Sequence, residues 1–126
     1  MSMRTPLSRV RGLGSTREGT GHFWKQRLTA VANLPLLFGF IWFVICSLGS
    51  SHAQFAASVG NPFVAALLIL FIVSGVVHMK LGMQVIIEDY VHGEGAKLAA
   101  LIGNIFFCAA AGLVGVLAVL KLAFGG

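Results

Sequence analysis

Three long apolar runs dominate this sequence and limit what the chain can fold into. They cover about residues 29–48, 62–88 and 98–120, and each is long enough for a helix to cross roughly 30 Å of hydrocarbon. Of the 126 residues, 57% are hydrophobic and 10% are charged, which leaves a domain of this size too little polar surface to face water. The sequence therefore predicts an all-α integral membrane protein, with three transmembrane helices in a bundle within a lipid bilayer.

The basic residues are concentrated before the first apolar run. Six of the nine Lys and Arg residues precede it, in a chain whose formal net charge is +5: Arg4, Arg9, Arg11, Arg17, Lys25 and Arg27. Basic residues resist translocation, so we expect residues 1–21 to form a basic cytoplasmic tail and residues 22–126 to form the membrane domain, with the amino end cytoplasmic. No nucleic-acid recognition module follows the tail, so we expect no nucleic-acid partner.

Two other targeting interpretations compete with a bacterial cytoplasmic tail. Residues 49–53 look like a signal-peptidase site, but the chain beyond them is too apolar to be a soluble mature protein. Residues 1–20 are rich in Arg and poor in acids, which also fits a mitochondrial transit peptide. We favour the bacterial inner membrane as the location over the mitochondrial inner membrane.

Prolines and polar residues divide the chain further. We expect the first helix to begin at about Gly21–Trp24 and to be kinked by Pro35. Residues 47–62 form the first connection, and residues 92–97 form a short polar turn before the third span. Small residues that let helices approach closely recur in that span: Ala99, Gly103, Ala111, Gly112 and Gly115. The two cysteines, Cys46 and Cys108, lie in apolar runs without metal-ligand spacing and are interpreted as small buried hydrophobic residues.

A histidine inside the second span is the first candidate functional residue. An ionisable group within a membrane span is costly and is a functional candidate by default. At 100° per residue, one face of this helix holds Phe71, Ser74, His78, Gly82, Val85 and Asp89. His78, with room left beside it by Gly82, suits an axial haem ligand, and a histidine hydrogen-bonded to a neighbouring helix is the alternative. The other histidines lie outside or at the edges of the spans, so a second axial ligand would come from another chain.

Polar groups at the inner end of the same helix form the second candidate. Asp89 and Tyr90 come where the span leaves the membrane, and the predicted topology places them on the same membrane face as Lys25 and Arg27. A phenol that donates a hydrogen bond, beside a carboxylate that handles protons, suits a quinone. The alternative is a solvated helix end with a tyrosine in the aromatic belt. Arg27, expected at the level of Asp89, suits haem propionates or lipid phosphate equally.

These positions together resemble the hydrophobic membrane-anchor subunits of succinate dehydrogenase. The similar pattern is a histidine, three residues, a glycine, six residues and then Asp-Tyr, here from His78 through Gly82 to Tyr90. Upstream, Arg27-Leu-Thr-Ala is similar to the Arg-x-Thr-Ala opening of that family's first helix, and Leu13-Gly14 fits its tail. The resemblance covers the chain from about residue 12 to the carboxyl end.

The resemblance implies a shared cofactor and several partner chains. An anchor of this family pairs with a second, cytochrome b membrane subunit, holds haem b jointly with it, and docks the flavoprotein and iron–sulfur subunits. Electrons from succinate then reach ubiquinone near the membrane edge. His78 would be one axial ligand of the haem iron, and Arg27 would lie near the propionates. Tyr90 would hydrogen-bond a quinone oxygen, with Asp89 supporting that site. The chain has no flavin or iron–sulfur motif, so it would have no activity alone.

Two alternative functions remain open on the sequence. A fumarate reductase anchor has the same architecture and works in the opposite direction. A small transporter or assembly protein belongs to another class, and such a protein would want charged or broken helices at the midplane, whereas the polar groups here cluster toward one edge. The role of Lys80 is also open, since its side chain could reach the membrane surface or pair with Glu88.

Overall fold

The structure is a computed structural model that describes residues 5–12 and 18–125. The described part is all helical and contains no strand. Its helices are α1 (Pro6–Val10), α2 (Glu18–Ser47), α3 (His52–Val59), α4 (Pro62–Tyr90) and α5 (Glu94–Ala123). Three of them are long and apolar enough to cross a membrane, over Thr20–Ser47, Pro62–Tyr90 and Glu94–Ala123. The predicted all-α membrane fold is therefore confirmed. Arg4, Arg17 and Leu13-Gly14, which the sequence analysis used, lie outside the described residues.

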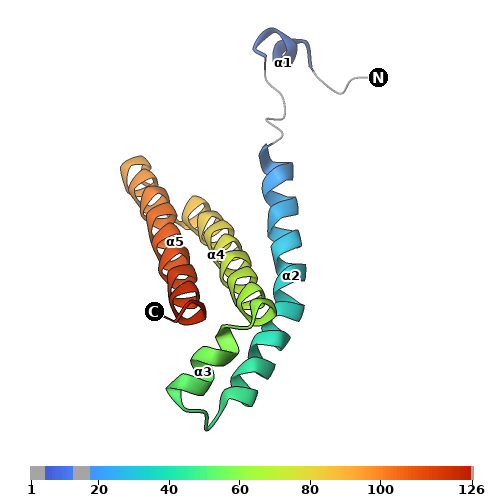
Figure 1. Cartoon of the computed structure of the whole chain (residues 1–126). Coiled ribbons are helices and arrows are strands. Elements are labelled where there is room, and N and C mark those ends of the chain that lie inside the picture. The colour runs from blue at the N-terminus through green and yellow to red at the C-terminus, as the bar shows by residue number, and fades with distance from the viewer. Residues whose placement is uncertain (1–4, 13–17, 126) are drawn as a thin grey trace.

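The long helices extend beyond the spans predicted from hydropathy. Helix α2 begins by Glu18, before the expected Gly21–Trp24, and α5 begins at Glu94, so that the turn before it shrinks to residues 91–93. Membrane helices continue into the interface because their backbone hydrogen bonds do not stop where the hydrocarbon ends. Helix α2 also continues through Pro35, and Figure 1 shows it bending along its length.

The first connection contains a helix that the sequence analysis missed. Helix α3 begins with a capping box, in which the Ser51 hydroxyl accepts from the Gln54 backbone N–H at 3.3 Å. In return, the Ser51 backbone N–H donates to the Gln54 side-chain oxygen at 2.9 Å. A serine followed three residues later by glutamine is a known signal for a helix start, so this helix was readable in the sequence.

Helix α4 lies between α2 and α5, and the three long helices run antiparallel in succession (Figure 1). Helix α3 packs against α4 and α5 at the end where α2 and α4 are connected. The main hydrophobic core is at this end and contains Val59, Leu68 and Val119. Away from it, α2 contacts its neighbours on one side and leaves most of its surface uncovered.

Large apolar side chains cover the outside of the three long helices. Trp42 is 72% exposed and Phe106 is 69% exposed in the isolated chain. Such surface is stable only against lipid or another apolar protein surface. Cys108 is buried, as predicted, but Cys46 is exposed on α2, so the prediction for Cys46 is wrong. It is wrong because Cys46 lies on an outward-facing part of an apolar helix. Such residues are covered only by lipid or by other chains of a larger assembly.

Glycines allow α4 to approach both neighbouring helices. An added Cβ at Gly39 would come within 2.8 Å of the Leu67 side chain, and one at Gly115 within 3.1 Å of the Ile72 side chain. The expected close packing of small residues in the third span is therefore confirmed at Gly115. It does not extend to Gly103, whose added Cβ would meet nothing within 4 Å.

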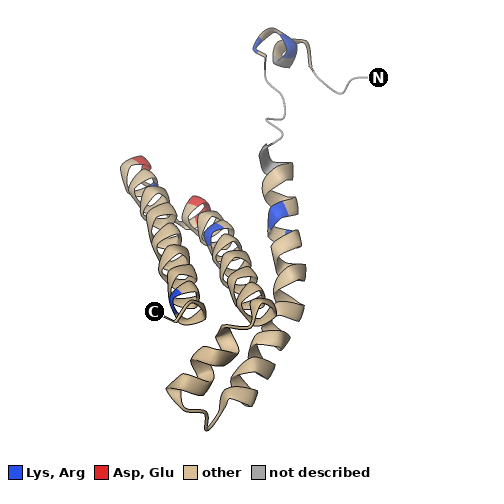
Figure 2. Cartoon of the chain, viewed as in Figure 1, with Lys and Arg blue, Asp and Glu red and all other residues tan. Residues whose placement is uncertain are grey.

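Charged residues gather toward the end of the bundle opposite α3 (Figure 2), and Lys121 lies near the end of α5. We call the end opposite α3 the charged end, and it holds Lys25, Arg27, Glu88, Asp89, Glu94 and Lys97, with Tyr90 beside them. These residues lie toward the same end of the bundle, which agrees with the prediction that they share one membrane face.

A bulky residue at Gly115 should separate α4 from α5. We expect Gly115→Leu to lower the free energy of unfolding by about 1–3 kcal/mol, because its side chain must displace Ile72. The measurement is the thermal unfolding midpoint of the detergent-solubilised chain. Gly103→Leu is the matched control, with the same change on the same helix and open space around it. Equal midpoints for the two variants would contradict the packing described here.

Candidate functional site

His78 lies on the face of α4 that packs against α2. Its Nδ1 is 3.2 Å from the Thr29 hydroxyl oxygen, so one ring nitrogen has a hydrogen-bond partner on the neighbouring helix. The other ring nitrogen, Nε2, makes no hydrogen bond with the described residues and is not fully buried. The half-buried imidazole therefore has one nitrogen held by the protein and one nitrogen without a hydrogen-bond partner in the described structure.

The stripe predicted on α4 faces α2 over much of its length. The Phe71 ring stacks on Phe40 of α2, with centroids 4.8 Å apart and an interplanar angle of 13°. Gly82 faces Gln26, since an added Cβ would lie 3.5 Å from the Gln26 side-chain nitrogen and near nothing else within 4 Å. Room is thus present beside His78, but a glutamine of the same chain borders it.

Polar side chains line the contact between α2 and α4, and sequence reasoning missed most of them. We define the polar column as Gln26, Thr29 and Asn33 of α2 together with Ser74 and His78 of α4. Gln26 Oε1, Asn33 Oδ1 and Ser74 Oγ are buried without a hydrogen-bond partner in the described structure. Each unpaired group costs about 1–3 kcal/mol when buried. The spacing i, i+3, i+7 of the α2 residues puts them on one helix face, which is the signal that could have found them.

Arg27 lies closer to the level of His78 than the sequence analysis placed it. Gln26 is opposite Gly82 and Thr29 is opposite His78, so Arg27 lies at the level of the 78–82 turn of α4 and not at the level of Asp89. The expected level is wrong because side-chain contacts set the register of the two helices, and span lengths do not reveal it. The exposed Arg27 guanidinium lies over the Phe23 ring, 4.9 Å from its centroid.

Asp89 and Tyr90 end α4 at the charged end of the bundle (Figure 2). Both are exposed, Tyr90 to 76%, and neither side chain has a hydrogen bond within the described residues. Along the helix axis, Asp89 lies about 16 Å from His78 at 1.5 Å per residue. The structure therefore places the two candidate groups on one helix but not in contact.

Lys80 does not pair with Glu88. The Glu88 carboxylate accepts from the Gln84 side-chain amide at 2.9 Å, and no ion pair to Lys80 occurs within the described ranges. The Lys80 carbonyl oxygen instead accepts a hydrogen bond of 3.0 Å from the Asn104 side-chain amide. Asn104 is a polar residue inside the third span that the sequence analysis did not select, although polar groups in spans are candidates by default.

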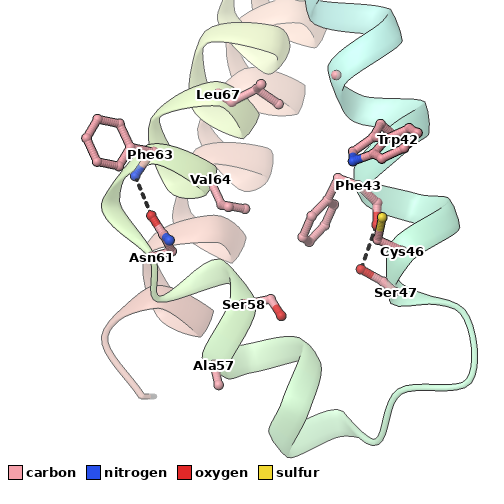
Figure 3. Close-up of a pocket in the computed structure, with 11 residues that line it drawn as sticks. Trp42, Phe43, Cys46, Ser47, Ala57, Ser58, Asn61, Phe63, Val64 and Leu67 are labelled. Atoms are coloured by element: carbon pink, nitrogen blue, oxygen red, sulfur yellow. Dashed lines mark hydrogen bonds between the residues drawn. The ribbon is translucent and has the colours of Figure 1, made fainter.

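A pocket lies at the other end of the bundle, away from His78. It has a volume of about 720 Å³ and is formed by the end of α2, α3 and the start of α4 (Figure 3). Its Ser47 hydroxyl donates to the Phe43 carbonyl oxygen at 2.7 Å, and its Ser58 hydroxyl donates to the Gln54 carbonyl oxygen at 3.1 Å. Both serine hydroxyl protons are therefore already used within the chain.

Comparison with known proteins agrees with this architecture. The family model described as the succinate dehydrogenase/fumarate reductase transmembrane subunit matches residues 1–112. A succinate dehydrogenase hydrophobic membrane anchor subunit of Paracoccus denitrificans is 39% identical over 103 residues, which are 82% of this chain and 79% of the relative. A succinate dehydrogenase membrane anchor subunit of Reclinomonas americana is 32% identical over 68% of this chain and 74% of its own length. No solved structure matches the chain with significance.

The family match and the fold agree in extent and in kind. The matched region includes α2, the polar column, α4 with its Asp-Tyr end, and most of α5. The resemblance noted from the His78–Tyr90 pattern is therefore confirmed by comparison with whole sequences as well as by short motifs. The chain belongs to the family of succinate dehydrogenase/fumarate reductase transmembrane subunits.

Proposed function

We propose that this chain is a membrane anchor of succinate dehydrogenase that docks the flavoprotein and iron–sulfur subunits on the bilayer. Its relatives carry that anchor name, and its three long helices supply the membrane domain. The charged end offers the polar surface on which water-soluble subunits would rest (Figure 2). The uncovered apolar faces of α2 and α5 would contact lipid and a second membrane subunit of the cytochrome b type.

The residues around His78 fit one side of a haem b shared with that second subunit. The observation that carries this part is that Nε2 of the imidazole has no hydrogen-bond partner in the described structure, whereas its other nitrogen is already held. Nε2 would bind the iron, and the Arg27 guanidinium, which has no carboxylate partner within the described ranges, would face the propionates. The other histidines, His22, His52 and His92, lie at or beyond the ends of the three spans, so the second axial ligand would come from the partner. When bound, haem supplies a one-electron redox centre.

The end of α4 suits the quinone. Reduction of ubiquinone to ubiquinol takes two electrons and two protons, and the protons are added at its two oxygens. The Tyr90 phenol would donate a hydrogen bond to one quinone oxygen, and the Asp89 carboxylate would support that site and handle protons. Both side chains are exposed and free to meet a ligand or a partner chain within the described structure.

The sequence left open a fumarate reductase anchor and a small transporter or assembly protein. Membership of this family argues against the transporter or assembly protein. The family description covers fumarate reductase as well, while the named relatives from Paracoccus denitrificans, Reclinomonas americana and Rickettsia bellii are all succinate dehydrogenase anchors. These names favour succinate oxidation. We also propose the bacterial inner membrane as the location, with the basic tail in the cytoplasm, because Lys and Arg resist translocation.

Replacement of His78 tests the haem proposal. In the purified complex we expect His78→Ala to remove most of the reduced b-type absorption, because the iron loses an axial ligand. His52→Ala, at the start of α3 and at the other end of the bundle, is the matched control and should keep the bands. Full b-type absorption in His78→Ala complex would rule out this ligand.

Tyr90→Phe tests the quinone proposal. It distinguishes a tyrosine that binds quinone from a tyrosine whose ring only sits at the membrane interface. The variant keeps the ring and removes the phenol donor, so we expect quinone reductase activity to fall about tenfold, the cost of roughly one hydrogen bond. Succinate oxidation measured with a soluble dye should be unchanged, because the dye does not use the membrane site. An unchanged rate with ubiquinone would show that the ring serves only the aromatic belt.

The orientation in the membrane can be read with reporter fusions. A phosphatase that is active only outside the cytoplasm should be active when fused after Gly126 and inactive when inserted in the turn at residues 91–93. The basic tail is the reason, since it holds the amino end inside and three spans then place the carboxyl end outside. The opposite pattern of activity would reverse the proposed topology.

A further inference from the structure

Thr29 makes three short contacts through one hydroxyl oxygen. Its Oγ1 lies 2.8 Å from the Lys25 carbonyl oxygen, 3.1 Å from the Gln26 carbonyl oxygen and 3.2 Å from His78 Nδ1. A hydroxyl has one proton to donate and two lone pairs with which to accept. Both carbonyl oxygens can only accept a hydrogen bond, whereas Nδ1 of a neutral imidazole can either donate or accept one. The single proton of Thr29 therefore has three candidate acceptors.

The distances decide where that proton goes. The contact with the Lys25 carbonyl is the shortest, and an oxygen–oxygen approach of 2.8 Å needs a proton between the two atoms. If the hydroxyl donated to His78 instead, two acceptor oxygens would face Thr29 without a proton. A Thr29 hydroxyl that donates within α2 can only accept from His78, which would then carry its proton on Nδ1.

This assignment fixes the state of the other ring nitrogen. A neutral imidazole has one N–H, so a proton on Nδ1 leaves Nε2 with a free lone pair. Nε2 is the nitrogen without a hydrogen bond in the described structure. We propose that Thr29 is a positioning residue for the haem, which holds His78 in the Nδ1–H tautomer and directs Nε2 to the iron.

This inference rests on the proposed ligation of haem by His78, and it adds a role that the ligand alone does not have. When the ring N–H that does not bind the metal donates a hydrogen bond, the ligating histidine becomes more basic and the orientation of its ring is fixed. A more basic ligand stabilises ferric over ferrous iron. Loss of the Thr29 hydroxyl should therefore raise the reduction potential of the haem.

The experiment compares purified complexes that carry Thr29→Val, Thr29→Ser or no change. Valine keeps the branched shape and removes the acceptor, whereas serine keeps the hydroxyl. The readouts are the haem midpoint potential, by redox titration of the b-type bands, and the low-spin electron paramagnetic resonance signal of the oxidised complex. We expect an upward shift in potential and a moved signal in Thr29→Val, with both restored in Thr29→Ser.

Ser47→Ala is the matched control. Ser47 makes the same kind of bond within α2, to the carbonyl oxygen of the residue four positions earlier, but it has no hydrogen bond to another helix in the described structure. Its replacement should leave the potential and the resonance signal as in the unmodified complex. A shift in this control equal to that in Thr29→Val would show a general effect on the helix and would overturn the proposal.

The remaining outcomes are also decisive. Equal potentials and signals in Thr29→Val and the unmodified complex would overturn the positioning role. If Thr29→Val and Thr29→Ala both fail to retain haem, recovery in Thr29→Ser supports the role and failure in Thr29→Ser contradicts it. If the b-type bands persist in the His78→Ala complex, His78 is not the haem ligand. This outcome is distinct from failure of the positioning role of Thr29, which the Thr29 variants test.

Discussion

One hydrogen bond between side chains, between His78 and Thr29, joins α2 and α4 in the described structure, and it occurs inside the membrane span. In hydrocarbon neither group can turn to water, so each needs a protein partner. The contact sets which residues of α2 lie opposite which residues of α4. Gln26 then faces Gly82, and Arg27 lies at the level of the turn that follows the imidazole. The same hydrogen bond leaves Nε2 of His78 available to a ligand.

Elements that depend on lipid alone were predictable from the sequence. The three spans follow from apolar length, and the face of α4 that holds Phe71 and His78 follows from helical periodicity. Elements that depend on side-chain contacts were not. The register of α2 needed the Thr29 contact, and Asn104 was overlooked because its partner, the Lys80 carbonyl, is a backbone group with no mark in the sequence. Helix α3 was missed although Ser51 and Gln54 carry its capping signal.

The isolated chain has the properties of one part of a larger membrane assembly. Its outer surface carries Trp42 and Phe106, and its polar column contains Gln26, Asn33 and Ser74 with atoms that lack partners. Buried polar atoms of this kind are normally satisfied by protein groups or ordered water. A partner subunit packed beside α2 and α4, with a cofactor between the two chains, would cover the apolar surface and give these groups neighbours. The family to which the chain belongs makes such an assembly the natural setting for His78.

A structure of the complete complex, determined with all its membrane and water-soluble chains, tests this account most directly. We expect a porphyrin between this chain and a second membrane subunit, its iron bonded to His78 Nε2, with Nδ1 still facing the Thr29 hydroxyl. A His78 ring that points into lipid, or one whose Nε2 is hydrogen-bonded to a protein group with no porphyrin beside it, would contradict the account.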